Sequence, residues 1–277
     1  MNNPLTLGFS PCPNDTFMFY PLVHGLEDTN GISFSERLED VETLNRLAVQ
    51  GVLDVSKVSY AALGHFREQY ALLRAGSALG RGCGPLLVVK EPLAVDDLTG
   101  TTIAIPGRYT TAHLLLRLFN PALVHFLEMP FHEIMDAVMT GRADAGVIIH
   151  ESRFTYQGFG LQQLVDLGAW WEQETGLPIP LGGIVAKRSL GGEAIRTIEQ
   201  ALSAAVEYAR ANPAAAARYI CEHAQEMSAE VCSAHIGLYV NDFSQQLGPE
   251  GEQAIVELLR RAEAAGIIPA SQAPLFI

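Results

Sequence analysis

Short apolar runs alternate with segments of helical periodicity along much of the chain, and this alternation restricts the fold more than any other feature. Such a pattern predicts an α/β unit with a largely parallel sheet, because each helix returns the chain to the edge where the next strand begins. In the first part of the chain, the expected strands and helix starts are 5–9 with Asp15, 32–38 with Val41, and 53–55 with Ser59.

A second set of alternating runs follows, and we place the boundary between the two sets after residue 91. Pro92 has no N–H for a strand ladder and disfavours helix at Glu91, which is typical of a connector. The run 182–186 predicts a strand that leads back to the first unit. The second set consists of 102–105 with Tyr109, 123–127 with Pro130, and 145–149 with a turn at His150.

The sequence thus predicts two lobes: a discontinuous first lobe of 1–91 and 187–277, and an inserted lobe of 92–186. A length of 277 residues suits two hydrophobic cores. Residues 193–210 carry apolar side chains at spacings of three and four, and further amphipathic helices are expected at 214–223, 229–239 and 250–265. Mixed, mostly parallel sheets with two crossing connectors are similar to the type II periplasmic-binding-protein fold.

Charge and hydrophobicity argue against several classes of protein. The formal net charge is −13, with 31 acidic and 18 basic residues, which would repel a nucleic acid backbone. No run approaches the roughly 18 apolar residues of a membrane span. Residues 1–10 lack the positive start of a signal peptide, so we expect a cytoplasmic protein. The scattered cysteines, without a CxxC pair, are expected to be free thiols.

The loop after the first expected strand is the first candidate for a site, because ligands of open α/β sheets bind beyond the carboxyl ends of strands. It reads Ser10-Pro11-Cys12-Pro13-Asn14-Asp15-Thr16-Phe17. Asn14 or Asp15 can simply cap the next helix. Two prolines and several polar groups in one turn also favour a role for Ser10, Asn14 and Asp15 in lining a cleft. Cys12 is either a nucleophile or an inert packed thiol.

Two further loops carry groups suited to an anion. Lys57 and Ser59 follow the third expected strand, and Thr110 and Thr111 begin a helix of the second lobe. Each of these residues can serve as a helix cap or as a ligand group. If the two helix starts face each other, they predict a binding site for a small molecule with a carboxylate.

His150 is the most specific chemical candidate, because it ends the apolar run 145–149 and is therefore expected at the cleft. A histidine titrates near neutral pH and suits general acid/base catalysis, although a histidine bonded within the fold would show the same pattern. The remaining histidines form no pair with metal-ligand spacing, so no metal site is expected.

Two motifs resemble one enzyme family. The stretch Phe9-Ser10-Pro11-Cys12-Pro13-Asn14-Asp15-Thr16-Phe17 is similar to the first signature of the 1,4-dihydroxy-6-naphthoate synthases of the futalosine route, and 148–156 is similar to their second. The resemblance in length and motif order covers nearly the whole chain. It implies a cofactor-independent lyase that converts cyclic dehypoxanthinylfutalosine in menaquinone biosynthesis, with His150 as the base and with Ser59, Thr110 and Thr111 at the ligand.

Two other functions remain open from the sequence. A chorismate dehydratase of the same pathway would also use a cleft between two lobes, but the Ser-Pro-Cys-Pro-Asn-Asp motif argues against it. A non-catalytic anion- or solute-binding protein would share the fold, and the missing signal peptide argues against that. The sequence gives no indication of the oligomeric state.

Overall fold

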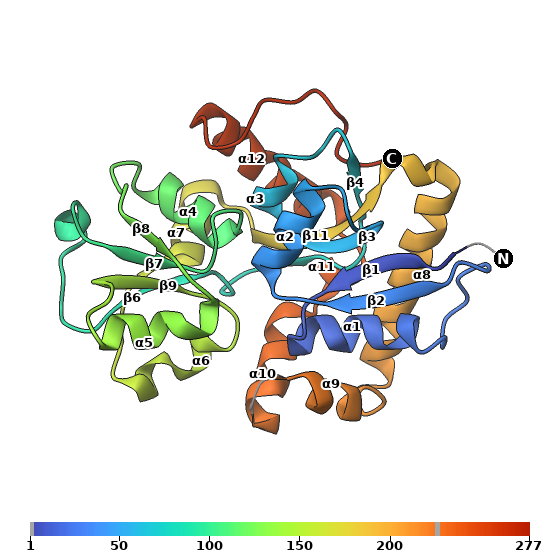
Figure 1. The fold of residues 1–277 in the computed structure, drawn as a ribbon, viewed down its shortest axis with the longest axis horizontal. Helices are drawn as coiled ribbons and strands as arrows, with labels where there is room; N and C mark the ends of the chain where they lie inside the picture. The colour runs from blue at the N-terminus through green and yellow to red at the C-terminus, as the bar shows by residue number, and fades with distance from the viewer. Residues whose placement is uncertain (1–2, 225–227) are drawn as a thin grey trace.

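The strands form two separate sheets, one in each lobe, in the computed structural model, which describes residues 3–224 and 228–277 (Figure 1). Met1 and Asn2, part of the amino-terminal stretch considered above, lie outside the described residues. The order in the first sheet is β2 (Phe34–Leu38), β1 (Leu5–Phe9), β3 (Val55–Ser59), β11 (Ile179–Lys187) and β4 (Tyr70–Leu72), and β5 (Ala78–Gly80) also pairs with β11.

The second sheet belongs to the inserted lobe. Its order is β10 (Gln162–Asp166), β6 (Leu86–Val89), β9 (Ala145–Ile148), β7 (Ile103–Ile105) and β8 (Phe126–Glu128). Both sheets are mixed, as expected. Parallel pairs are β1–β2, β1–β3, β7–β8 and β7–β9, whereas all pairs of β11, β6 and β10 are antiparallel. Parallel pairs are therefore not the majority of the strand pairs in the described residues. The strands next to the lobe crossings run antiparallel to their neighbours.

The chain crosses between the lobes at positions different from those expected. β6 pairs with β9 and β10 in the second sheet, so the first crossing lies at 81–85 and precedes the predicted boundary after residue 91. β11 pairs with β3 in the first sheet, so the second crossing lies at 176–178 instead of at residues 186 and 187. Pro92 lies within the second lobe, shortly after the end of β6 at Val89, and it does not separate the lobes.

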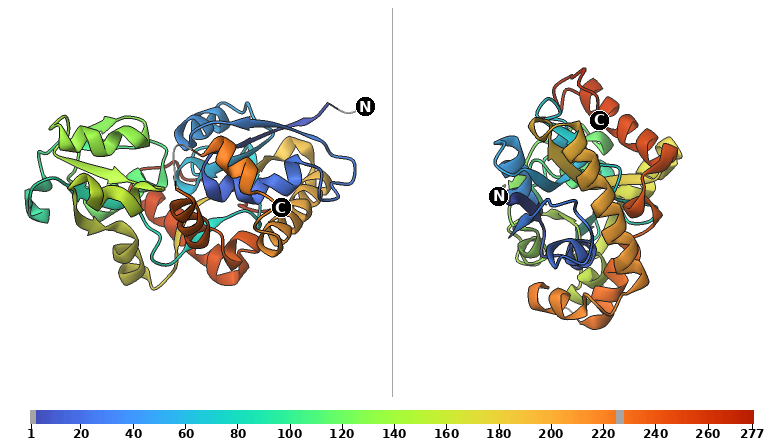
Figure 2. Two further views of the ribbon diagram at one scale, coloured as in Figure 1. Left: turned by 90° about the horizontal axis from the view of Figure 1, so that it is seen from below. Right: turned by 90° about the vertical axis from the view of Figure 1, so that its right-hand side faces the viewer.

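The observed helices agree with the predicted ones where the segment of helical periodicity is long. α2 (Val41–Val49) begins at the expected residue, and α8 (Gly192–Ala211), α9 (Ala217–His223), α10 (Ala229–Tyr239) and α12 (Gly248–Ala264) correspond to the four predicted C-terminal helices. Figure 2 shows the C-terminal helices gathered on the first lobe. The other α-helices are α1 (Pro13–Val23), α3 (Tyr60–Leu63), α4 (Thr111–Phe119), α5 (Ile134–Met139), α6 (Ser152–Thr155), α7 (Leu167–Thr175) and α11 (Asp242–Gln245).

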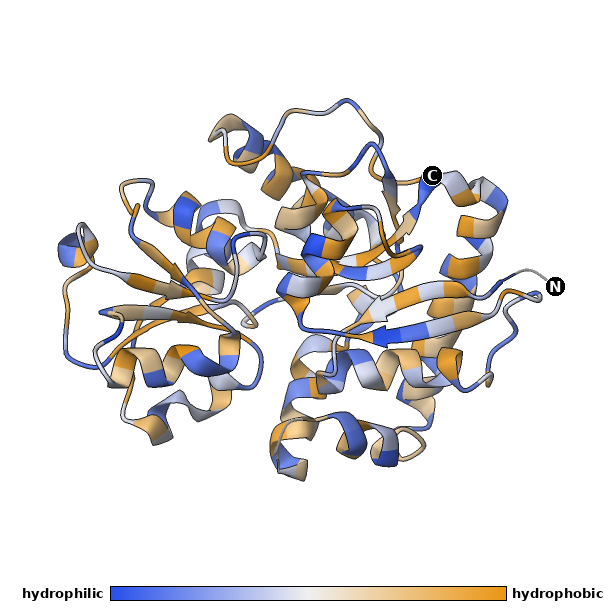
Figure 3. Cartoon of the chain, viewed as in Figure 1, coloured by the Kyte–Doolittle hydropathy of each residue, from blue (hydrophilic) through white to orange (hydrophobic). Residues whose placement is uncertain are grey.

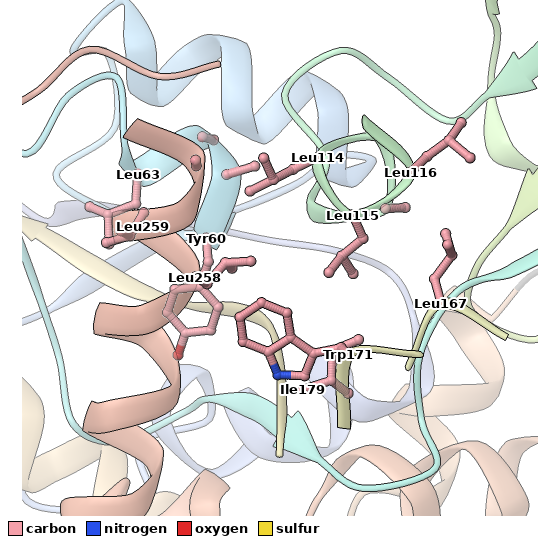
Figure 4. Packing of buried hydrophobic residues seen from close by; sticks show 14 of the residues in the cluster. Tyr60, Leu63, Leu114, Leu115, Leu116, Leu167, Trp171, Ile179, Leu258 and Leu259 are labelled. Atoms are coloured by element: carbon pink, nitrogen blue, oxygen red, sulfur yellow. The ribbon is translucent and has the colours of Figure 1, made fainter. Parts of the chain in front are cut away.

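One apolar cluster joins the two lobes. Trp171 of α7 is fully buried and lies among side chains of α4 from its own lobe and of α3 and α12 from the first lobe (Figure 4). Its indole N–H donates to the Pro178 carbonyl oxygen at 3.1 Å. Figure 3 shows that most strands are hydrophobic, whereas the helices carry both kinds of residue. The lobes are therefore held together by buried surface as well as by the two crossings.

No helix within the described part of the chain is long and apolar enough to cross a lipid bilayer.

Candidate functional site

Eight residues singled out in the sequence line one pocket between the lobes. They come from four strand ends: the parallel neighbours β1 and β3 end at the pocket in the first lobe, and β7 and β9 end there in the second. This is the place where open α/β sheets bind ligands. The eight residues are Ser10, Asn14, Asp15, Lys57, Ser59, Thr110, Thr111 and His150.

A second, wider pocket opens next to this inner pocket. The two share Ser10, Val41 and His150, and their cavity volumes are about 90 Å³ for the inner and about 620 Å³ for the outer pocket. The inner pocket alone is smaller than the roughly 300–1,000 Å³ of typical ligand sites. A ligand larger than the inner pocket would therefore extend into the outer pocket, past His150.

Asp15 organises the first wall of the inner pocket. One carboxylate oxygen accepts the backbone N–H of Ser10 at 3.2 Å and its hydroxyl at 2.8 Å, and the other accepts the Asn14 amide at 2.8 Å and the Lys57 ammonium. Four donors thus converge on one carboxylate that is 2% exposed. In this arrangement Asp15 positions Ser10, Asn14 and Lys57. These side chains, and not Asp15 itself, are placed to contact a ligand directly.

Asn14 presents a free acceptor at the pocket wall. Its amide nitrogen donates to Asp15, which fixes the orientation of the amide, and its oxygen is buried with no partner among residues 3–224 and 228–277. Buried polar atoms normally have a hydrogen-bond partner. A ligand in the pocket would satisfy this oxygen by donating a hydrogen bond, as a hydroxyl group does.

Lys57 lies within β3, because this strand extends to Ser59 and not only to Val55 as expected. Its ammonium group is buried against Asp15, and the pair carries no net charge. Gly182 on the neighbouring β11 lies beside the Lys57 side chain, where a Cβ would be 3.4 Å from Lys57 Cε. An ammonium has three donors, so Lys57 still has N–H groups for an acceptor on a ligand.

Three hydroxyl groups surround the start of α4. Thr110 caps this helix by accepting the His113 N–H at 3.3 Å and donates to the Gly107 carbonyl oxygen at 2.7 Å. Thr111 donates to the Leu181 carbonyl oxygen at 2.6 Å. Both threonine protons are thus engaged by backbone. Ser59 accepts the Asn45 amide at 3.1 Å, and its own proton remains available to a ligand.

The backbone at the start of α4 supplies further donors. The N–H groups of Thr111 and Ala112 are in the first helical turn, where no intrahelical carbonyl can accept them, and both residues line the inner pocket. A carboxylate is stabilised at such a helix start by these groups and by the helix dipole.

His150 follows β9 and has a left-handed backbone with φ of 54°. This conformation is uncommon outside glycine, although histidine, asparagine and aspartate adopt it more often than other residues. The His150 ring lies edge-on to Phe131, with centroids 5.0 Å apart, and stacks against His235 at 6.0 Å. Burial lowers the pKa of His150, while the carboxylates of Glu151 and Asp15 oppose that shift. Burial therefore favours the neutral form of the ring, which can accept a proton.

Cys12 is buried at the start of α1 and lines the outer pocket. Burial raises the pKa of the Cys12 thiol, and the Glu151 carboxylate adds to the effect. Since the thiolate is the reactive form, this geometry favours the inert alternative over the nucleophile. All four cysteines are free thiols.

Periodicity gave no indication of the contacts made by Glu42, a buried residue of α2. Its carboxylate accepts the Tyr109 N–H of the second lobe at 3.1 Å, and Arg46 on the same helix binds Glu128 of that lobe. Gly107 permits this approach, because a Cβ there would lie 2.4 Å from Glu42 Oε2. Such a contact joins residues far apart in the chain.

Across the described residues, no group of three or more His, Cys, Asp or Glu side chains is arranged to hold a metal ion.

Comparisons with known proteins found a family model and relatives that are similar to this chain over nearly its whole length. The family model VitK2_biosynth, described as menaquinone biosynthesis, matches residues 5–264. The 1,4-dihydroxy-6-naphthoate synthase of Thermus thermophilus is 51% identical over 99% of both chains. The protein of the same name from Streptomyces coelicolor is 49% identical over 96% of this chain and 95% of its own. These relatives are named synthases, not chorismate dehydratases.

Solved structures confirm the fold. Protein AF1704 from Archaeoglobus fulgidus has a TM-score of 0.90 and 35% identity, covering 96% of this chain and 98% of its own. The Candida albicans CA3427 gene product exhibits the generic periplasmic binding protein structural fold. It has a TM-score of 0.71 and 16% identity, and the match covers 98% of this chain and 92% of its own. At that identity the second likeness shows the fold alone.

Proposed function

We propose a reaction on the premise that the chain belongs to the 1,4-dihydroxy-6-naphthoate synthase family of menaquinone biosynthesis, as its family match and two relatives show. The protein is then an enzyme of this pathway. The reaction we propose is that of a carbon–carbon lyase: it cleaves cyclic dehypoxanthinylfutalosine and releases 1,4-dihydroxy-6-naphthoate and the sugar portion.

The chemistry of the inner pocket supports a ligand with one carboxylate and hydroxyl groups. Donors that remain for a ligand include the Ser59 hydroxyl, the Lys57 ammonium and the first N–H groups of α4, and the Asn14 oxygen is an acceptor that remains. A dihydroxynaphthoate complements both kinds of group. Its carboxylate would accept from the donors, one hydroxyl would donate to Asn14, and the sugar of the substrate would extend toward the outer pocket.

His150 is the general base of the proposed mechanism. It lies where the inner and outer pockets meet, which is where the bond between bicycle and sugar would lie. The neutral imidazole removes a proton from the bound bicycle, and the electron pair left behind forms a double bond in the ring. The carbon–carbon bond to the sugar breaks in this retro-aldol-like or eliminative step, and the imidazolium returns the proton to the departing sugar portion, which leaves with the electron pair of that bond. Aromatisation to the naphthoate provides the driving force. The surrounding hydrogen bonds hold the substrate in the reactive orientation.

The observation that carries this proposal is the position of His150 at the junction of the two pockets. The test is to incubate the purified protein with cyclic dehypoxanthinylfutalosine and to measure 1,4-dihydroxy-6-naphthoate by chromatography. His150→Ala and His150→Asn are expected to lose activity, and asparagine tolerates the left-handed backbone. His125→Asn, at an exposed histidine before β8, serves as the control. A wild-type protein that forms no naphthoate, or an active His150→Asn variant, would refute the proposal.

A further inference from the structure

His235 is a buried histidine that the sequence did not single out. It lies on α10, its side chain is 0% exposed, and neither ring nitrogen has a hydrogen-bond partner among the residues that the structure describes. A buried imidazole without partners loses its hydration without compensation. Such a group calls for an explanation, for example a bound water molecule or a functional role, so the location of this ring matters.

The ring lies directly behind the proposed base. The centroids of His235 and His150 are 6.0 Å apart and the ring planes differ by 22°, while Phe131 contacts His150 at 5.0 Å. Figure 1 shows that α10 belongs to the first lobe, whereas His150 follows β9 of the second. The base therefore contacts an apolar ring of its own lobe and a polar ring of the other.

His150 itself has no hydrogen bond that orients its ring within 3–224 and 228–277. General bases in enzymes are usually oriented by a third group that binds the second ring nitrogen. His235 is suited to this task because burial, together with the nearby His150 and Lys57, lowers its pKa to about 3. It is thus neutral at physiological pH and offers one donor and one acceptor.

We propose that His235 is a positioning residue for His150: a hydrogen bond between the two imidazoles, bridged by one water molecule, selects the tautomer and orientation of the base. This inference rests on the proposed function in taking His150 as the base. His235 touches no reacting atom in this role and takes up no proton.

The experiment compares His235→Phe, His235→Asn and His235→Gln with the wild-type enzyme. Phenylalanine keeps a stacked ring without nitrogens, whereas the two amides place a polar group near one or the other nitrogen position. We expect His235→Phe to lower kcat about tenfold to a hundredfold with little change in KM, because the base is misplaced while substrate binding is retained. One of the two amides should recover part of kcat. Cys232→Ala, also buried on α10, controls for general damage to this helix.

A second readout does not depend on turnover. Imidazole nitrogen chemical shifts in labelled protein report the tautomer and pKa of His150, and both are expected to change in His235→Phe and not in Cys232→Ala. Wild-type kcat and unchanged shifts in His235→Phe would overturn the proposal, as would equal losses in all three His235 variants with a raised KM. An inactive wild-type protein would instead refute the proposed function, and the shifts would still test the contact between the rings.

Discussion

The Glu42 carboxylate of the first lobe accepts a hydrogen bond from the Tyr109 N–H of the second lobe at 3.1 Å. Tyr109 immediately precedes Thr110 and Thr111, which line the inner pocket. The contact therefore fixes a loop of one lobe against a helix of the other, at the side of the pocket. Because Glu42 is buried, the same contact makes this region sensitive to pH.

Glu42→Gln is expected to stabilise the protein at alkaline pH. Burial raises the pKa of Glu42 to about 7 from an ordinary value of 4.5, so its ionisation opposes folding. The protonated Glu42 carboxyl stabilises the fold fully below about pH 4.5, and this stability is lost as the pH rises through about 7. It amounts to at most about 3.5 kcal/mol on the scale of about 1.4 kcal/mol per pKa unit. Glutamine stays neutral and can still accept the Tyr109 N–H.

The measurement is the free energy of unfolding by urea at pH 8.5 and pH 5. The difference between Glu42→Gln and wild type should be larger at pH 8.5. Equal differences at both values would show that Glu42 ionises normally in the folded protein.

Lys57→Met is expected to destabilise the fold, because it leaves the Asp15 carboxylate buried without its cation. Breaking a buried ion pair costs about 3–5 kcal/mol, whereas replacing both partners is often nearly neutral. The double variant Lys57→Met/Asp15→Asn should therefore recover most of the stability but not the activity. Urea unfolding of the two single variants and the double variant measures the coupling. Additive losses would contradict a buried pair.

The acid limb of the kcat/KM profile is expected below the ordinary histidine pKa of 6.5, since burial lowers the pKa of His150. The base must be neutral, so activity rises with pH through this value. Four charged groups act on the ring: Glu151, Asp15 and Asp40 raise its pKa, and Lys57 lowers it.

Glu151→Gln removes the strongest of the opposing carboxylates, so the limb should move to still lower pH. Rates measured from pH 4.5 to pH 8 with the naphthoate assay provide the check. A limb at or above 6.5, or one that moves upward in Glu151→Gln, would be inconsistent with a desolvated His150.

Gly84→Ala is expected to lower stability by about 1–3 kcal/mol, the usual cost of overpacking. Gly84 lies in the first lobe crossing, and a Cβ there would be 2.3 Å from the Gly168 Cα, which is rigid backbone. Gly158→Ala is the matched control, because that position has open space and no left-handed backbone. Thermal unfolding should separate the two variants, and a neutral Gly84→Ala would mean that the crossing is able to shift.

Most strand ends were predictable from the sequence, that of β3 excepted, but the partners of strands were not. The eight candidate residues lie together because each follows or ends an apolar run, and parallel strands bring such ends to one edge. The boundary after residue 91 was wrong because Pro92 is a local signal, whereas the sheet to which β6 belongs depends on pairing with residues 145–148.

The chemistry within the pocket was also only partly predictable. A sequence shows that Asp15 and Lys57 are both polar and near strand ends, but not that they neutralise each other across 42 positions. Likewise, the stacked pair of His150 and His235 depends on the packing of α10, and its apolar stripe does not specify which side chain faces the base.

The cluster around Trp171 bears on whether the inserted lobe could fold on its own. A lobe with its own sheet could be expected to tolerate removal, or exchange with the lobe of a relative. Here α4 and α7 complete the same interior as α3 and α12, so excision would leave Tyr60 and Leu258 facing solvent. We therefore expect the two lobes to unfold together, and calorimetry should record a single melting transition for a chain that has two sheets.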